Sequence, residues 1–175
     1  MRTFYLLLLL AAMFTSCIRN TGTDKVHKVS EKKIRKQALA IAEKYAMGQV
    51  PKSKKETKDN IMMIGDKQKS FIIDTARIFT GFVDEDSTVD AIVSIDTYTD
   101  QFPDYTRHLI LTRQGRKLTL TRVIESDLNI LRLKDRIISA EVPTRPRTSP
   151  LYKCRSCQKL VDFQFRAGVL DTVKR

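Results

Sequence analysis

The sequence predicts an α+β fold in which one N-terminal amphipathic helix packs on an antiparallel meander sheet of about five or six strands. Two patterns predict this class. Apolar residues recur with helical spacing over residues 30–47 and alternate with polar residues from residue 61 onward. The alternating runs and their links are short, which favours sequential antiparallel pairing. The chain of 175 residues, 42 % of them hydrophobic, is long enough for one domain with its own core.

The helix is expected over residues 30–47. Ser30 can serve as its N-cap, and Glu31 in the first turn suits the helix dipole. Gly48 and Pro51 follow and should end it. One apolar stripe should face the sheet: Ile34, Ala38, Ile41 and Tyr45.

The strands are read from alternation and from the turn residues between them. The basic stretch PKSKKETKDN at residues 51–60 is expected to be a solvated loop. Turns are expected at Gln114-Gly115 and at Lys134-Asp135. Strands are expected at residues 70–82, 89–95, 105–111, 118–124, 128–133 and 136–142.

The chain opens with MRTFYLLLLLAAMFTSC. Arg2 precedes an apolar run over residues 4–14, which is shorter than the about 20 residues that span a membrane as a helix. Such a run suits the apolar region of a secretory signal peptide. Cys17 ends a four-residue box, Phe14-Thr15-Ser16-Cys17.

This N-terminus resembles a bacterial lipoprotein signal, over residues 1–17. The resemblance implies cleavage before Cys17, diacylglycerol on its sulfur and acylation, as with palmitate, of its new amino group. Several acyl chains anchor a protein stably to a membrane. Ile18, in place of Asp, implies the outer membrane, with the domain facing the periplasm. An ordinary cleavable signal and a membrane-spanning segment are the alternatives.

The chain is expected to divide into a signal peptide at residues 1–16, a lipidated tether at 17–29, an α+β domain at 30–142 and a C-terminal segment at 143–175. The last part begins with PTRPRTSP, a proline-rich stretch that predicts a stiff extended spacer or a covering loop. Residues 160–165 can form a further strand.

The net charge of +12 is unevenly distributed, with an acidic middle between two basic parts. A basic balance often indicates nucleic acid, but a lipid-anchored periplasmic protein is not expected to meet it. Anionic lipid head groups, lipopolysaccharide and peptidoglycan carboxylates are the acidic neighbours of that compartment. A solvated basic surface without a specific ligand is the favoured explanation of the charge.

Cys154 and Cys157 form a Cys-x-x-Cys pair. A disulfide closing a short loop is the favoured interpretation, because an oxidising compartment preserves such bonds. A structural zinc site needs four ligands, and His27 and His108 are the only histidines of the chain. A redox-active pair is also open, since Lys153, Arg155 and Lys159 would favour a thiolate.

The other candidate residues are expected to have structural or solvated positions and no functional role. Asp84, Asp86 and Asp90 resemble a fragment of a calcium loop, but the glycine and glutamate of such loops are missing, so an acidic turn is expected. Asp96, Asp100 and Asp104 are expected to be solvated around a loop. His108 is expected to be a partly exposed strand residue.

The favoured hypothesis is a non-catalytic envelope lipoprotein that binds protein partners, as an accessory or anchoring subunit of a secretion or transport assembly. No catalytic residue, metal or cofactor is expected, because no catalytic or phosphate-binding motif is present. The alternatives are a binder of a small ligand or envelope polymer on the sheet's concave face, and a thiol-disulfide protein using Cys154 and Cys157.

The disulfide interpretation predicts that the unreduced protein contains no alkylatable thiol at Cys154 or Cys157. Mass spectrometry after alkylation, with and without a reductant, measures this directly. Two alkylated cysteines in the unreduced sample would contradict it.

Overall fold

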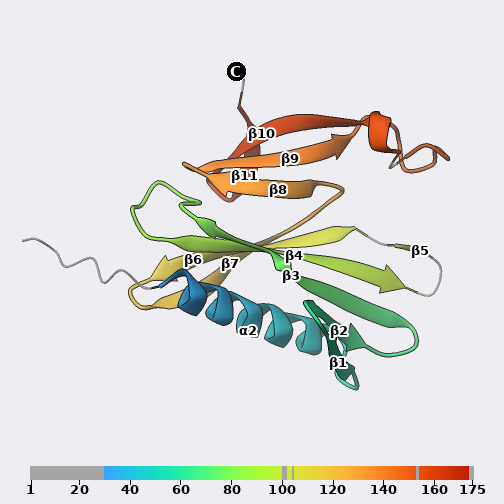
Figure 1. The fold of residues 1–175 in the computed structure, drawn as a ribbon, viewed down its shortest axis with the longest axis horizontal. Helices are drawn as coiled ribbons and strands as arrows, with labels where there is room; N and C mark the ends of the chain where they lie inside the picture. The colour runs from blue at the N-terminus through green and yellow to red at the C-terminus, as the bar shows by residue number, and fades with distance from the viewer. Residues whose placement is uncertain (1–29, 100–101, 104, 153, 174–175) are drawn as a thin grey trace, which may run out of the picture.

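The computed structural model describes residues 30–99, 102–103, 105–152 and 154–173. These residues form three layers: one helix, a large antiparallel sheet and a smaller antiparallel sheet (Figure 1). The helix lies on one face of the large sheet and the smaller sheet lies on the other. The predicted α+β class, with a helix packed on an antiparallel sheet, is confirmed.

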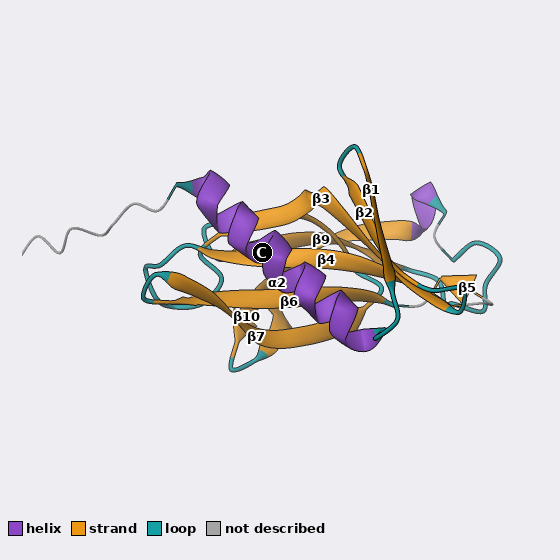
Figure 2. Ribbon diagram, turned by 90° about the horizontal axis from the view of Figure 1, so that it is seen from below, coloured by secondary structure: helices purple, strands orange, loops and turns teal. Residues whose placement is uncertain are grey.

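The helix α2 (Glu31–Gln49) crosses the large sheet on its outer face, as Figure 2 shows from below. Ile41 and Tyr45, predicted for the centre of its stripe, lie partly buried at the flanks. Ser30 stands at the predicted cap position, but its side chain makes no capping hydrogen bond; its carbonyl accepts from the Lys33 and Ile34 amides at 2.9 and 3.2 Å. The fully buried row recurs every four residues: Ile34, Ala38, Ala42 and Ala46. The alanines let the helix backbone lie close to the sheet.

The large sheet has the order β1-β2-β3-β4-β6-β7, with β5 beside β4, over the described residues. Every pairing in it is antiparallel. Gly115 has φ +64° in the turn between β6 and β7, a conformation that glycine adopts without strain. The strands are β1 (Lys54–Lys58), β2 (Ile61–Gly65), β3 (Lys69–Gly81), β4 (Asp90–Thr99), β5 (Phe102–Pro103), β6 (Thr106–Gln114) and β7 (Lys117–Ser126).

The prediction of a loop at residues 51–60 is wrong for Lys54–Lys58, which form β1. All five side chains of β1 are exposed, so the segment has no apolar alternation to detect. It is a strand because its backbone pairs with β2, whose Met62 and Ile64 are buried under the helix.

The smaller sheet has the order β11-β10-β9-β8, with β8 (Asn129–Lys134), β9 (Ile137–Pro143), β10 (Gln158–Arg166) and β11 (Val169–Thr172). The predicted last hairpin therefore forms, but it starts a second sheet instead of extending the first. Asp135 and Arg136 both have positive φ in its two-residue turn, the geometry that suits the twist of a tight hairpin. The strand expected at residues 160–165 lies within β10.

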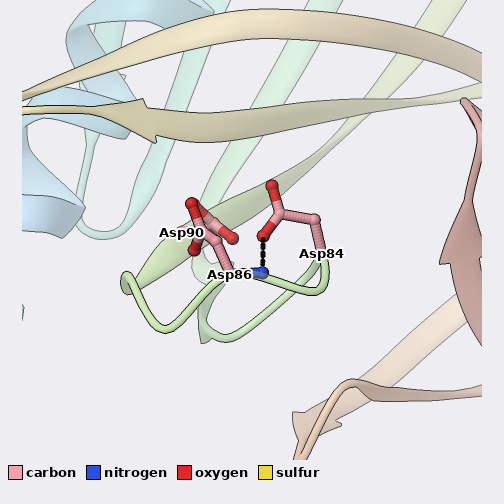
Figure 3. Close-up of side chains that lie close together, drawn as sticks. All are labelled: Asp84, Asp86 and Asp90. Carbon is pink, nitrogen blue, oxygen red and sulfur yellow. Dashed lines mark hydrogen bonds between the residues drawn. The ribbon is translucent and has the colours of Figure 1, made fainter.

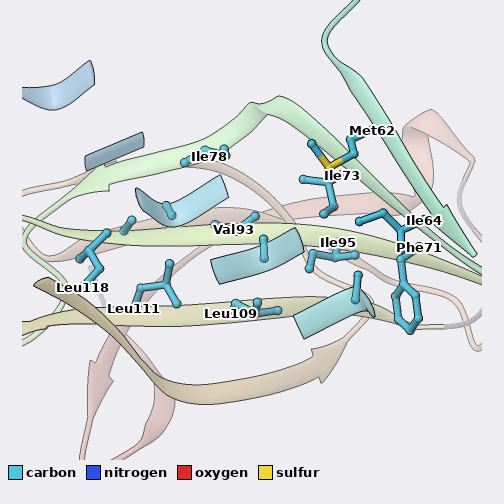
Figure 4. Close-up of a cluster of buried hydrophobic side chains, with 14 of the residues drawn as sticks. Met62, Ile64, Phe71, Ile73, Ile78, Val93, Ile95, Leu109, Leu111 and Leu118 are labelled. Atoms are coloured by element: carbon cyan, nitrogen blue, oxygen red, sulfur yellow. The ribbon is translucent and has the colours of Figure 1, made fainter. Parts of the chain in front are cut away.

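Two apolar cores result, one on each face of the large sheet. Figure 4 shows the core between the helix and the sheet, to which β4 contributes Ala91, Val93 and Ile95. Ile92 points the other way, into the core between the two sheets, where Ile138 and Phe163 of the smaller sheet meet it. The middle strands of the large sheet are thus buried on both faces, which explains their nearly continuous apolar sequences.

The tight helix–sheet contact predicts that Ala42→Leu lowers the free energy of unfolding by about 1–3 kcal/mol, because the fully buried alanine has no room for the larger side chain. Urea denaturation followed by circular dichroism measures the change. The matched control is Ala40→Leu on the exposed side of the same helix, which should change it by less than about 0.5 kcal/mol. Equal effects of the two substitutions would contradict the close packing.

Candidate functional site

The face of the large sheet that looks toward the smaller sheet changes character along its length. Successive residues of a strand alternate between faces, so Ile92, Ser94, Asp96 and Tyr98 of β4 all lie on this one. Ile92 belongs to the core between the sheets, Ser94 is buried, Asp96 is half-buried and Tyr98 is 42 % exposed. The face therefore runs from an apolar core, through a polar zone, to an uncovered end.

Ser94 and His108 form a buried pair in the polar zone. They lie opposite each other on β4 and β6, and the Ser94 Oγ lies 2.9 Å from the His108 Nδ1. Burial lowers the pKa of His108 to about 4, and the positive charge of Arg77 acts in the same direction. The imidazole is therefore neutral near pH 7. The prediction of a partly exposed histidine is wrong, because the smaller sheet covers the face on which it lies.

Arg77, Asp96 and Thr106 form a second polar group beside this pair. The Arg77 Nη1 donates to the Asp96 Oδ2 at 2.5 Å, and the Thr106 Oγ1 donates to the Asp96 Oδ1 at 2.8 Å. Asp96 lies within β4 and is paired, so the prediction of a solvated loop residue is wrong for it. Asp100 and Asp104 lie outside the described residues.

A pocket of about 230 Å³ opens next to this group, between the ends of the two sheets. We call it the interlayer pocket. Both sheets and the connection between β7 and β8 supply its walls. Its lining residues are Arg77, Asp96, Thr97, Tyr98, Thr106, Asp127, Leu128, Asn129, Pro143 and Gln158.

The proline-rich stretch lies against the protein beside the pocket. Arg147 holds the Asp127 carboxylate with two nitrogens, its Nε at 3.0 Å from both oxygens and its Nη2 at 2.7 Å from Oδ1. The same guanidinium stacks on the Tyr105 ring, 3.6 Å from the ring centroid. Of the two structures expected for this stretch, these contacts are those of a covering loop.

The cysteine pair lies at the start of β10, in the 3₁₀ turn η1 (Arg155–Cys157). The Cys154 and Cys157 sulfurs lie 2.05 Å apart, the distance of a disulfide bond. Thr144 donates to the Cys157 carbonyl from its amide at 2.8 Å and from its Oγ1 at 2.9 Å. The turn thus joins the loop to Gln158 of the pocket wall. The oxidation state of the pair in the cell stays a prediction.

Asp84 and Asp86 in the turn before β4 lie close to Asp90, the first residue of β4, with ligand oxygens within 4.8 Å of one another (Figure 3). They are the carboxylates, among the described residues, that are grouped closely enough to share a cation. Each also accepts hydrogen bonds from its own surroundings. Asp84 accepts from the Asp86 amide, and Asp86 accepts from the amide and hydroxyl of Thr88.

Asp90 is fully buried and ties this turn to the sheet. Its Oδ1 accepts from the Arg113 amide at 2.8 Å and its Oδ2 from the Val83 amide at 3.1 Å. Burial raises its pKa to about 6, although both amides favour the charged form. The Arg136 guanidinium donates hydrogen bonds to the backbone carbonyls of residues 84, 85 and 86. These bonds build a tightly held acidic turn.

An apolar surface lies at the uncovered end of the large sheet. Ile61 and Met63 of β2, Ile72 of β3 and Tyr98 of β4 share the face that looks toward the smaller sheet. Ile61 and Met63 are each 39 % exposed. In Figure 1, β1 and β2 lie near the C-terminal end of α2, on the side away from the smaller sheet. We call these four residues the open apolar patch.

No pattern in the sequence announced the pocket or the patch, because their residues come from several strands and connections that are far apart in the chain. Residues 1–29, with Cys17, lie outside the described residues. In the described part of the chain, no helix has the length and apolar character needed to cross a membrane. Comparison of the chain with models of known protein families, with curated protein sequences and with solved structures gives no match.

The burial of His108 predicts a pH-dependent stability. Its pKa is below the unfolded value of about 6.5, so as the pH falls from 6.5 toward 4 the unfolded chain gains a proton that the folded protein does not. The free energy of unfolding should fall by up to about 3 kcal/mol over this range.

His108→Gln keeps a side chain able to bond Ser94 but removes the titration. Urea unfolding at several pH values should therefore show a smaller fall for this variant than for the natural protein. Asp90 titrates in both proteins, so its contribution cancels in the comparison. Parallel profiles between pH 6.5 and 4 would contradict the assignment.

Proposed function

We propose that this protein is a non-catalytic lipoprotein of the cell envelope, anchored in the outer membrane through Cys17 with its domain facing the periplasm. In this proposal it binds a protein partner, as an accessory or anchoring subunit of a periplasmic assembly of the secretion or transport type. The observation that carries the partner-binding part is the open apolar patch.

The patch has the composition of a protein interface. Its centre is apolar, with Met63 next to Ile72 across the β2–β3 pairing. Charged residues border it on the same face: Glu56 pairs with Met63, and Lys58 and Asp74 pair with Ile61. An apolar centre with a charged rim is the usual arrangement of protein-binding surfaces. Where the smaller sheet lies over this face, as at Ile92 and Ile110, the face is already covered, so a partner on the patch would extend that cover.

The surroundings of the candidate chemical groups favour binding over catalysis. Ser94 and His108, a hydroxyl beside a base, are both fully buried, where a substrate would not reach them. Cys157 is also buried, and its carbonyl is held by Thr144, as suits a structural turn better than a thiol-disulfide centre.

A second candidate function is the binding of a small ligand or envelope polymer. The interlayer pocket is the observation that favours it. The concave face of the sheet was the expected site. The helix covers one face of the large sheet and the smaller sheet covers much of the other, and the pocket lies where the cover of the smaller sheet ends.

The proposal predicts that Met63→Glu reduces partner capture by about tenfold or more, because a carboxylate placed in the patch would be desolvated on binding. The full-length protein would be expressed with a C-terminal tag in its native host, crosslinked gently in membranes and purified. Mass spectrometry would identify and quantify the proteins that co-purify.

Leu160→Glu is the matched control, since Leu160 is exposed on the outer face of the smaller sheet and should leave capture unchanged. Cys17→Ser should release the protein from the membrane and reduce capture. Failure to obtain a reproducible partner set, or equal capture by the two glutamate variants, would contradict the proposal. Unchanged thermal unfolding of both variants would show that the fold is intact.

A further inference from the structure

We infer that the interlayer pocket binds a neutral, polyhydroxylated ligand, such as one sugar residue of a glycan. This names the ligand class of the second candidate function and rests on the pocket, which shares Tyr98 with the open apolar patch but none of the patch residues of β2 and β3. Four features of the pocket carry it: its size, its charge balance, its hydrogen-bonding groups and the aromatic ring at its edge.

The pocket is small and polar. Its volume of about 230 Å³ lies below the about 300–1,000 Å³ of sites for drug-sized apolar molecules. Leu128, Pro143 and the ring of Tyr98 are its apolar elements, and hydroxyl, amide and charged residues supply the remainder. A compact ligand with several polar groups suits such a lining, whereas an acyl chain does not.

The charges of the wall are already balanced. Asp96 is paired with Arg77, and Asp127 is paired with Arg147, which approaches it from the covering loop. A charged ligand would have to enter beside two existing ion pairs, without an unmatched charge to compensate the loss of its hydration. A neutral ligand meets no such cost, so the charge balance selects against both anions and cations.

The Arg77–Asp96 ion pair leaves acceptor positions on the carboxylate that hydroxyl groups of a ligand can use. A carboxylate offers about four acceptor positions, and Asp96 uses one on each oxygen for Arg77 and Thr106. The Thr106 Oγ1, which donates to Asp96, keeps acceptor capacity of its own in the pocket wall. Fixed acceptors of this kind match hydroxyl donors spread around a ring.

Tyr98 supplies an aromatic face at the border of the pocket. It is 42 % exposed and lies on β4 two residues beyond Asp96, on the same face. A sugar ring has one side rich in C–H groups, which packs on an aromatic ring while the hydroxyls at its edge find polar partners. The Arg147–Asp127 pair and the Thr144–Cys157 hydrogen bonds hold the opposite wall in place, so little ordering is needed on binding.

The test uses the full-length protein in a sugar-free zwitterionic detergent, titrated by calorimetry with three tetrasaccharides. Chitotetraose and cellotetraose are neutral, and fully deacetylated chitotetraose carries positive charges on the same backbone. Measurable binding is expected for at least one neutral tetramer at concentrations up to about 10 mM. The cationic tetramer should bind about tenfold more weakly than chitotetraose or cellotetraose, whichever binds better.

Substitutions then locate the site. Tyr98→Ala should weaken binding about tenfold, whereas Tyr98→Phe, which keeps the ring, should bind within about threefold of the natural protein. The Tyr98 side chain is exposed, so these variants should fold normally, and Leu160→Ala is the matched exposed control.

The inference is overturned if neither neutral tetramer binds, if the cationic tetramer binds best, or if Tyr98→Ala binds as the natural protein does. Met63→Glu should retain glycan binding while losing the protein partner. Failure of the glycan site and failure of the partner surface are therefore distinguishable.

Discussion

Burial of the large sheet on both faces is the constraint on which the remainder of this structure depends. The helix covers one face through a row of alanines, and the smaller sheet covers the other with residues such as Ile138 and Phe163. The residues of the middle strands that lie between these two layers must therefore suit a closed environment. Apolar residues do so directly, and a polar one must find a hydrogen-bonding partner inside the protein.

The polar residues of β4 show how this requirement shapes the site. Ser94 is buried and forms a hydrogen bond with His108, which is held neutral. Asp96 accepts hydrogen bonds from Arg77 and from the Thr106 hydroxyl. These groups lie where the apolar core between the sheets ends. The pocket and the open apolar patch follow in that order along the same face, where the cover of the smaller sheet ends. One face of one sheet thus holds a core, a polar pocket and an exposed apolar surface.

The C-terminal part of the chain completes the pocket from a long distance in sequence. β10 pairs with β9, and the loop between them returns to the β7–β8 connection through Arg147 and Asp127. The turn of Cys154 and Cys157 lies where this loop meets β10, with Thr144 bonded across it. In the described structure, residues 158–172 therefore act with the preceding strands as one layered unit, and the proline-rich stretch serves as part of its surface.

Local pattern alone determined much of the fold. The helix over residues 30–47, the strands β3, β4 and β6 to β9 and the turns at Gly115 and Asp135 were all predictable, because each depends on the spacing of apolar residues or on turn chemistry within a few positions. The alternation of apolar and polar residues could not show that the side chains on both faces of a middle strand are buried. A strand with one covered face and a strand with two differ only in what packs on them, so His108 was misread as partly exposed.

Tertiary structure alone decided the remaining features. β1 is a strand through its pairing with β2, without an apolar pattern of its own, and the final hairpin joined a second sheet although its sequence would have suited the first equally. Arg77, Asp96 and Asp127 come together from separate strands and connections, so no spacing in the chain announces the pocket. Backbone pairing and layer packing join residues without regard to their distance in sequence, and these two interactions, more than any local preference, place the candidate site.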